Sequence, residues 1–381
     1  MNFEFATATR VVFGAGKLKE IGALAQGLGK RALVVIGKSA GAVQRVESML
    51  SALTETGIEY ATFSVVGEPT LGVVRTGTQR ARDEHCDFVI GFGGGSVIDT
   101  GKAVAALFTN GGDPLDYVEV IGKGQPLTKP SAPYVAIPTT AGTGAEVTRN
   151  AVLGSPEQRV KVSLRSAFML PRVALVDPEL TYDLLPQLTA TTGMDALTQL
   201  IEAFVSVKAN PMTDAICREG MFRAARSLRR ACEHGDDVAA RQDMCVASLF
   251  GGMALANAGL GAVHGLAGPI GGMFDAPHGA LCAVLLPHVM EVNRGMIRGP
   301  AGRGAVSAPT EIVGRFEEVA NIVGDLGELV GALKIPPLRQ YGVTGDDFAA
   351  IIEKSRSSSS MKGNPLPLRD EELREILERA L

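Results

Sequence analysis

The chain has few cysteines and histidines for its length, and the way the cysteines are spaced excludes two kinds of protein. Its 381 residues include five cysteines, an odd number, and none of them forms a C-x-x-C pair. A disulfide framework or a zinc knuckle would need paired cysteines, so we expect neither. Scattered cysteines of this kind are typical of reduced thiols, and we therefore predict a cytoplasmic protein.

Basic clusters and long apolar runs are also missing. The formal net charge is −4, and the segment Arg223–Arg230, the one notable basic stretch, is most simply a solvated helix face. We therefore expect no nucleic-acid partner. No apolar run reaches the roughly 20 residues that span a bilayer. The N-terminus lacks the basic start and apolar core of a signal peptide, so we expect no membrane association.

What the chain does contain is enough apolar material for large cores. Hydrophobic residues make up 46% and charged residues 20% of the sequence, which indicates a globular protein of about two domains. Its 46 glycines stand at the ends of apolar runs rather than in a low-complexity tract. That distribution fits a fold with many tight turns between strands and helices.

The first half alternates short apolar runs with amphipathic helical patterns, such as 42–56, 73–84 and 99–108. Strands are predicted at 31–36, 60–66, 88–92, 134–137 and 173–176, each bounded by Gly, Pro, Asp or Thr. Alternation of this kind predicts a mostly parallel sheet covered by helices on both faces.

The second half, from Leu188 onward, has long amphipathic patterns and hardly any β-type alternation. The break at Pro186-Gln187 suggests a boundary, with Thr189 as a possible N-cap of the next helix. We therefore divide the chain into an α/β domain, 1–187, and an all-helical domain, 188–381. Helices are predicted at 190–207, 212–233, 239–258, 278–293, 315–323, 326–333, 345–355 and 370–380.

A run of three glycines follows the predicted strand 88–92. Gly93, Gly94 and Gly95 would let the backbone approach a ligand closely, Ser96 is a natural N-cap, and Asp99 follows at capping-box spacing. Free amides and the helix dipole would then favour a pyrophosphate. The alternative is a simple tight turn, but three glycines exceed what a turn needs. The full G-x-G-x-x-G fingerprint is absent after the strand 31–36.

A second polar loop follows the predicted strand 134–137 and contains Thr139, Thr140 and Thr143. Its hydroxyls and glycine amides should lie at the carboxyl end of the sheet, where open α/β sheets bind ligands. An ordinary Ser/Thr turn is the alternative, which four threonines and two glycines in eleven residues make less attractive.

Metal-binding side chains stand in two segments of the second half. His264 and His278 lie fourteen residues apart in an apolar, glycine-rich stretch, and Asp195 and Gln199 lie four apart on one helix face. Two imidazoles and a carboxylate are ligand types of a divalent metal. The alternative is a set of buried polar residues that hydrogen-bond within a helical core.

Taken together, these motifs resemble the iron-containing (group III) alcohol dehydrogenase family over almost the whole chain. The resemblance rests on Phe13-Gly14-Ala-Gly16, Gly93-Gly-Gly-Ser96 with Asp99, 137–144, Asp177-Pro178, 193–198, and Pro277-His278 followed by 286–288, all in the family's order. It implies a dehydroquinate synthase-like architecture, with a Rossmann-like N-terminal domain, a helical C-terminal domain and an active site in the cleft. It also implies hydride transfer between a nicotinamide cofactor and an alcohol, aldehyde or ketone.

The same resemblance implies metal ligands at Asp195, His264 and His278, with Gln199 where the family has a histidine. A glutamine oxygen is a weak ligand for iron or zinc, so we expect weakened metal binding or a metal-free site in which His264 or His278 donates the proton. A further family histidine is replaced by Gly268, which enlarges the pocket and removes a relay. Cys282, one turn after His278, either approaches the site or, as we prefer, is a buried core residue. Glu202 either orients a ligand or makes a structural contact.

The cofactor is expected to be NAD or NADP. Family members specific for NAD tend to have an aspartate near Gly37, and its absence here, with Lys38 and Ser39 beside it, predicts that NADP is accepted. We also expect a homodimer or higher homo-oligomer. Two alternatives remain open: a metal-independent reductase resembling maleylacetate reductases, and a non-catalytic nucleotide-binding relative.

Overall fold

The computed structural model describes residues 2–37, 42–274, 276–298 and 310–381. These divide into two compact units, which we call the sheet unit and the helical unit. The sheet unit comprises 7–140 and 144–183, and the helical unit comprises 184–381 together with the short segments 1–6 and 141–143.

The sheet unit is built on six strands in the order β1-β8-β5-β4-β2-β3, and every neighbouring pair is parallel. The predicted parallel sheet is therefore confirmed, with all five predicted strands in it. The strands are β1 (Arg10–Phe13), β2 (Arg31–Gly37), β3 (Glu59–Val65), β4 (Phe88–Gly93), β5 (Tyr134–Pro138) and β8 (Val173–Val176).

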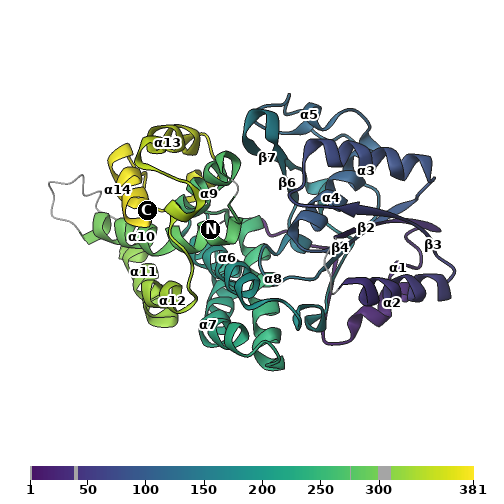
Figure 1. The fold of residues 1–381 in the computed structure, drawn as a ribbon, viewed down its shortest axis with the longest axis horizontal. Coiled ribbons are helices and arrows are strands. Elements are labelled where there is room, and N and C mark those ends of the chain that lie inside the picture. Colours follow the sequence, from purple (N-terminus) through teal and green to yellow (C-terminus); the bar gives the residue numbers. More distant parts are fainter. Residues whose placement is uncertain (1, 38–41, 275, 299–309) are drawn as a thin grey trace. The chain divides into compact units, whose positions relative to one another are not determined.

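Helices cover both faces of this sheet, as Figure 1 shows, because successive side chains of a strand point to opposite faces and both sets are apolar. In β2, Ala32 and Val34 pack into the core cluster formed with α1 (Ile21–Ala25) and α2 (Ala42–Glu55). Leu33 and Val35 belong to the opposite cluster, with α3 (Leu71–Asp83) and α4 (Gly95–Asn110).

Several elements of the sheet unit were not predicted, among them an edge strand, a hairpin and a short helix. The edge strand β1 pairs with β8, so the strand that ends at Gly37 is the second along the chain and not the first. A separate antiparallel hairpin joins β6 (Asn150–Ser155) to β7 (Val160–Arg165). The short helix α5 (Pro114–Tyr117) begins with a capping box at its N-cap, Asp113.

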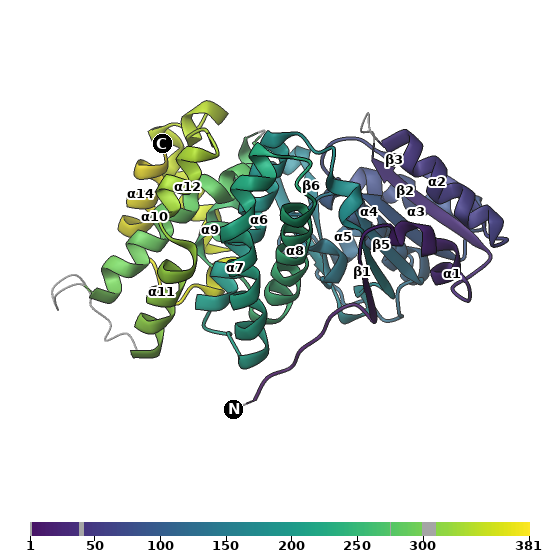
Figure 2. The same ribbon diagram turned by 90° about the horizontal axis from the view of Figure 1, so that it is seen from below.

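The helical unit confirms the all-helical second half. Figure 2 shows α6, α7 and α8 lying side by side, in agreement with their contacts. Each predicted helix is found, within a few residues at its ends, and α9 is additional. The helices are α6 (Pro186–Val205), α7 (Pro211–Glu233), α8 (Val238–Ala258), α9 (Ala262–Met273), α10 (His278–Arg298), α11 (Thr310–Val323), α12 (Leu326–Ala332), α13 (Phe348–Arg356) and α14 (Asp370–Ala380).

The start of α6 differs from the prediction. The helix begins with Pro186 in its first turn, and its N-cap is Leu185 rather than Thr189. A proline suits the first turn because the amide it lacks would have had no helical partner there. Thr189 instead accepts a hydrogen bond at 2.8 Å from the buried guanidinium of Arg241 on α8.

One described helix meets the length and composition of a membrane span, the window 278–297 of α10, with a mean hydropathy of 1.2. Within the structure 61% of this window is buried, as expected for a core helix, so it is weak evidence for a span.

Candidate functional site

The turn between β4 and α4 leads into a helix whose first amides have no side-chain cap. The N-cap of α4 is Gly94, in an extended conformation, and it makes no side-chain capping bond. Ser96 therefore lies inside the first turn, and its predicted role as N-cap is wrong. The predicted capping box is also wrong, because the Asp99 carboxylate accepts the amide of Val152 in β6 at 2.9 Å. The amides at the start of α4 are left for another acceptor.

This turn lies at the point where the chain changes direction across the sheet. From β2 the chain proceeds to β3 on one side and then returns to β4 on the other. The carboxyl ends of β2, β4 and β5 share one edge, with Ile36 opposite Phe92 and Gly93 opposite Pro138. Ligands of open α/β sheets bind at such a switch point.

The other residues predicted to bind the cofactor have different surroundings. Gly37 ends β2, and a Cβ on it would lie 3.3 Å from Val97 of α4. Thr139 donates its amide to Gly93 at 2.9 Å, and Thr140 lies beside Gly94. Thr143 falls within the helical unit. Lys38 and Ser39 lie outside the described residues.

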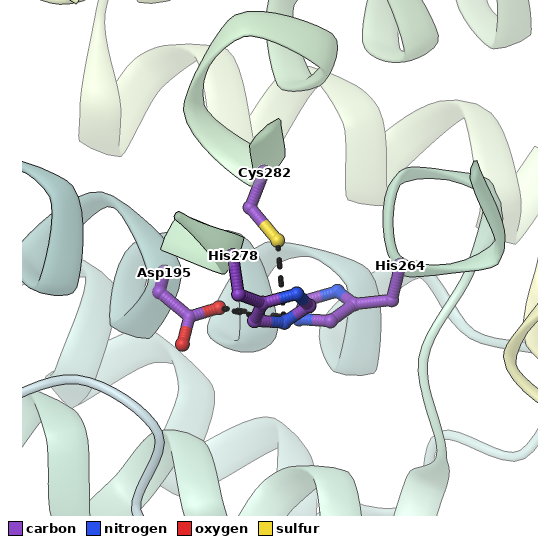
Figure 3. A group of neighbouring side chains, drawn as sticks. All are labelled: Asp195, His264, His278 and Cys282. Atoms are coloured by element: carbon purple, nitrogen blue, oxygen red, sulfur yellow. Dashed lines mark hydrogen bonds and ion pairs between the residues drawn. The ribbon is translucent and has the colours of Figure 1, made fainter. Parts of the chain in front are cut away.

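In the helical unit, three helices bring together four side chains with metal-ligating atoms: Asp195 of α6, His264 of α9, and His278 and Cys282 of α10. One such atom from each lies within 4.8 Å of the others (Figure 3). The Nε2 of His264 is 3.3 Å, and that of His278 3.7 Å, from Oδ1 of Asp195. Asp195, His264 and Cys282 are buried, whereas the side chain of His278 is 35% exposed. The cluster therefore has one side open to solvent.

Glu202 of α6 lies behind His264 and explains how α9 starts. Its carboxylate accepts the Val263 amide at 2.7 Å and lies 2.6 Å from Nδ1 of His264. An acidic group at the first turn stabilises free amides and the helix dipole. In the neutral imidazole, a bond from Nδ1–H to this carboxylate selects the tautomer that has its lone pair on Nε2, the nitrogen beside Asp195. Glu202 thus makes a structural contact to α9 and also holds His264, the predicted ligand.

Charges within the cluster oppose the effect of burial. Burial alone lowers the pKa of His264, but Cys282, Asp195 and Glu202 outweigh it and raise that pKa well above its usual value. The pKa of His278 is raised in the same way, by Cys282 and Asp195 against burial. Burial raises the pKa of Asp195, but the two imidazoles overcome this and lower it. The site therefore attracts positive charge, as a metal site must.

Gln199 and Gly268, the two positions where the chain departs from the family pattern, have different surroundings. The buried Oε1 of Gln199 has no hydrogen-bond partner, and it lies 3.0 Å from where a Cβ of Gly251 on α8 would be. Gly268 lies one turn after His264 in α9, and a Cβ added to it would have no atom within 4 Å, so this position has free space.

The sheet unit also contains a buried ion pair, between Lys102 and Asp99, that the sequence did not predict. Lys102 of α4 is fully buried and donates to the carbonyls of Ala145 and Asn150, both at 2.7 Å. Its Nζ lies 3.6 Å from Asp99. Because Asp99 also holds β6, this group ties α4 to the segment 145–152. Nearby, burial raises the pKa of Glu146 to about 7.

Comparison with known proteins gives a match along the chain. A family model described as iron-containing alcohol dehydrogenase matches residues 8–178, and a model for the C-terminal part of the same family matches 189–381. A 1,3-propanediol dehydrogenase of Citrobacter freundii is 36% identical over 387 residues, covering 99% of this chain and 98% of that protein. Alcohol dehydrogenase 4 of Schizosaccharomyces pombe is also 36% identical, covering 97% and 87%.

Solved structures have the same fold. A 1,3-propanediol oxidoreductase superposes with a TM-score of 0.89 at 36% identity, covering 100% of both chains. An iron-containing alcohol dehydrogenase from Thermotoga maritima gives a TM-score of 0.87 at 33% identity, covering 100% of this chain and 99% of that one.

Proposed function

This chain belongs to the iron-containing alcohol dehydrogenase family, and we propose that it transfers a hydride between NAD(P)(H) and a small alcohol, aldehyde or ketone. The observation that carries the proposal is the cluster of Asp195, His264 and His278, with Glu202 behind it. A carboxylate and two imidazoles fit a divalent iron or zinc ion. The carboxylate–histidine pair adds the outer contact that metal-bound imidazoles usually make.

In this mechanism the protein supplies position and electrostatics. The cofactor, when bound, supplies or accepts the hydride at C4 of its nicotinamide. Asp195, His264 and His278 hold the metal, which when bound polarises the substrate oxygen and stabilises alkoxide charge. Glu202 accepts Nδ1–H of His264, so Nε2 would be the nitrogen that gives up its proton when a metal binds. In protein without metal, His278 is the better proton donor because its side chain reaches solvent.

The sheet unit binds the cofactor. Amides at Gly94, Gly95 and Ser96 begin α4 without a side-chain cap, and the pyrophosphate accepts them there. We further propose that NADP is accepted, because Gly37 at the end of β2 places no carboxylate against a 2′-phosphate.

An activity screen tests the proposal. Protein reconstituted with Zn²⁺ or Fe²⁺ should consume NADH or NADPH with an aldehyde and form the alcohol in equal amount. His278→Ala should lower kcat/KM at least ~100-fold, about 2.7 kcal/mol, through loss of Lewis-acid stabilisation. His234→Ala, at an exposed histidine that ends α7, should leave it unchanged. Equal activity in the two variants would show that the cluster is not the active site.

A further inference from the structure

Cys282 is the one member of the cluster whose side chain contributes sulfur. It lies on α10 four residues after His278, so the two side chains share a face of the helix. Its Sγ is 3.6 Å from Nε2 of His278, and it also interacts with Asp195 and His264. It is fully buried, and its Sγ points toward the other side chains of the cluster (Figure 3). Cys282 is buried, but it also approaches the candidate metal site, so the preferred interpretation of Cys282 as an ordinary core residue is wrong.

We propose that Cys282 is the fourth protein ligand of the metal, so that the ion is held by Asp195, His264, His278 and a thiolate. The inference rests on the metal centre of the proposed function, and it concerns which atoms bind the ion rather than which substrate reacts. On binding, the Cys282 sulfur forms a bond to the divalent ion and its thiol proton passes to solvent, with no change of oxidation state.

Two of the three separations between ligand atoms agree with one tetrahedral ion, and the third, 3.7 Å between His278 Nε2 and Asp195 Oδ1, is about 0.4 Å longer than the expected value. Bonds of about 2.3 Å to sulfur and about 2.05 Å to nitrogen, at a tetrahedral angle, put the two atoms about 3.6 Å apart. The separation of Sγ and His278 Nε2 is 3.6 Å. Nitrogen and oxygen ligands with bonds of about 2.0 Å should be about 3.3 Å apart. The separation of His264 Nε2 and Asp195 Oδ1 is 3.3 Å.

The position of Gln199 supports the same ligand set. Gln199 shares α6 with Asp195, but its unpaired Oε1 lies against Gly251 of α8. The His, Cys, Asp and Glu side chains of the cluster come from α6, α9 and α10, and none of them from α8. A neutral amide oxygen is also a weaker ligand than a thiolate for zinc. We therefore assign the fourth donor to the sulfur on α10 rather than to the glutamine oxygen.

A thiolate changes the chemistry of the ion. With one carboxylate and one thiolate, the ligands bring two negative charges to a divalent ion, and thiolate favours zinc among the metals available to such a site. The predicted weakening of metal binding through Gln199 is then offset by Cys282. We therefore expect a zinc enzyme in this chain.

Spectroscopy of the full-length protein tests the ligand directly and needs no turnover. X-ray absorption at the zinc edge of the wild-type protein, loaded with one Zn²⁺, should show a sulfur scatterer at about 2.3 Å. The Co²⁺-substituted protein should show a thiolate-to-cobalt charge-transfer band in the near ultraviolet. Cys282→Ser should lose this band and bind Zn²⁺ at least ~10-fold more weakly.

Two variants serve as matched controls. Cys232→Ser, at a half-buried cysteine of α7, and Gln199→Leu should both keep the charge-transfer band. The proposal is overturned by a zinc shell of nitrogen and oxygen alone, by a band that survives Cys282→Ser, or by folded protein that binds neither metal. A sulfur-ligated metal in a protein that reduces no carbonyl would refute the proposed function and leave the ligand set standing.

Discussion

Replacing Glu202 with glutamine tests how the cluster is prepared for a metal. Glu202 accepts both the Val263 amide and Nδ1–H of His264, and it is 3% exposed. A glutamine has one acceptor oxygen and one donor nitrogen in place of the two carboxylate oxygens. If its oxygen accepts the Val263 amide, its NH₂ faces Nδ1 and selects the tautomer with a proton on Nε2, the atom that must bind the ion.

The opposite orientation of the amide is also unfavourable. With its oxygen toward His264, the NH₂ would face the Val263 amide, and two buried donors would be left opposed. In either orientation, metal affinity should fall by about 10- to 100-fold, about 1.4–2.7 kcal/mol, the range found when the outer partner of a metal-bound histidine is lost. Competitive titration of the metal-free protein with Zn²⁺ against a chromophoric chelator measures this change.

The control for Glu202→Gln is the same substitution at a glutamate of the helical unit that lies away from the cluster. Glu353 on α13 is exposed, and Glu353→Gln should bind Zn²⁺ as the wild type does. Circular dichroism and urea unfolding establish that each variant is folded. If folded Glu202→Gln binds Zn²⁺ with wild-type affinity, the hydrogen bond to Nδ1 does not prepare His264, and the reasoning fails.

Four further outcomes are expected. Gly94→Val should raise the Kd of the cofactor at least ~10-fold, about 1.4 kcal/mol, by filling the space beside the start of α4. Because a Cβ there meets nothing closer than 3.5 Å, the variant should fold, and unchanged affinity in calorimetry would remove this turn from the cofactor site. Gly268→His should fit the free space one turn from His264 and shift kcat/KM from bulky toward short aldehydes, whereas an unchanged ratio would place this position away from the substrate. Gly37→Asp should lower kcat/KM with NADPH relative to NADH, and a preference that stays the same would show that the end of β2 does not select the cofactor. Burial raises the pKa of Glu146 from 4.5 to about 7, so its contribution to stability is lost as the pH rises from the unfolded to the folded pKa. Glu146→Gln should therefore raise the free energy of unfolding by about 2–3 kcal/mol at pH ~8 and by little at pH ~4.5. Urea unfolding at the two pH values measures this difference, and an equal gain at both would contradict it.

The elements that the sequence predicted well are those in which one periodic pattern dominates. The buried strands β2, β4 and β5 are continuous apolar runs, and α7 and α14 have clear amphipathic faces. The edge strand β1 has only four residues, none of them buried, and it is held in the sheet by pairing with β8, a contact that local sequence does not reveal.

Helix α9 was missed because its sequence argues against a helix. It contains several glycines and Pro269, all poor helix formers. It forms because tertiary contacts supply what propensity does not: the Glu202 carboxylate from α6 accepts amides of its first turn, and its apolar side chains are buried. The helix that carries His264 is therefore one in which local preference and final structure disagree.

The sequence predicted three residues of the candidate metal site, but it did not show which of Cys282 and Gln199 lies with them. Asp195, His264 and His278 were predicted from motifs, and the structure brings them together. The spacing of His278 and Cys282 placed the sulfur on the same helix face, but whether that face met Asp195 depended on how α10 packs on α6. The side-chain orientation of Gln199 toward α8 has no signal in the sequence.

The central claim, hydride transfer between a nicotinamide and a carbonyl carbon, is tested most directly with deuterium. Zinc-loaded protein is incubated with an aldehyde and NADH or NADPH that carries deuterium at C4 of the nicotinamide, and the alcohol is examined by mass spectrometry and NMR. The account predicts one deuterium on the carbinol carbon for each cofactor oxidised when the labelled face is the one used. No alcohol with either cofactor labelled on either face, or an alcohol with solvent hydrogen at that carbon in every case, would contradict it.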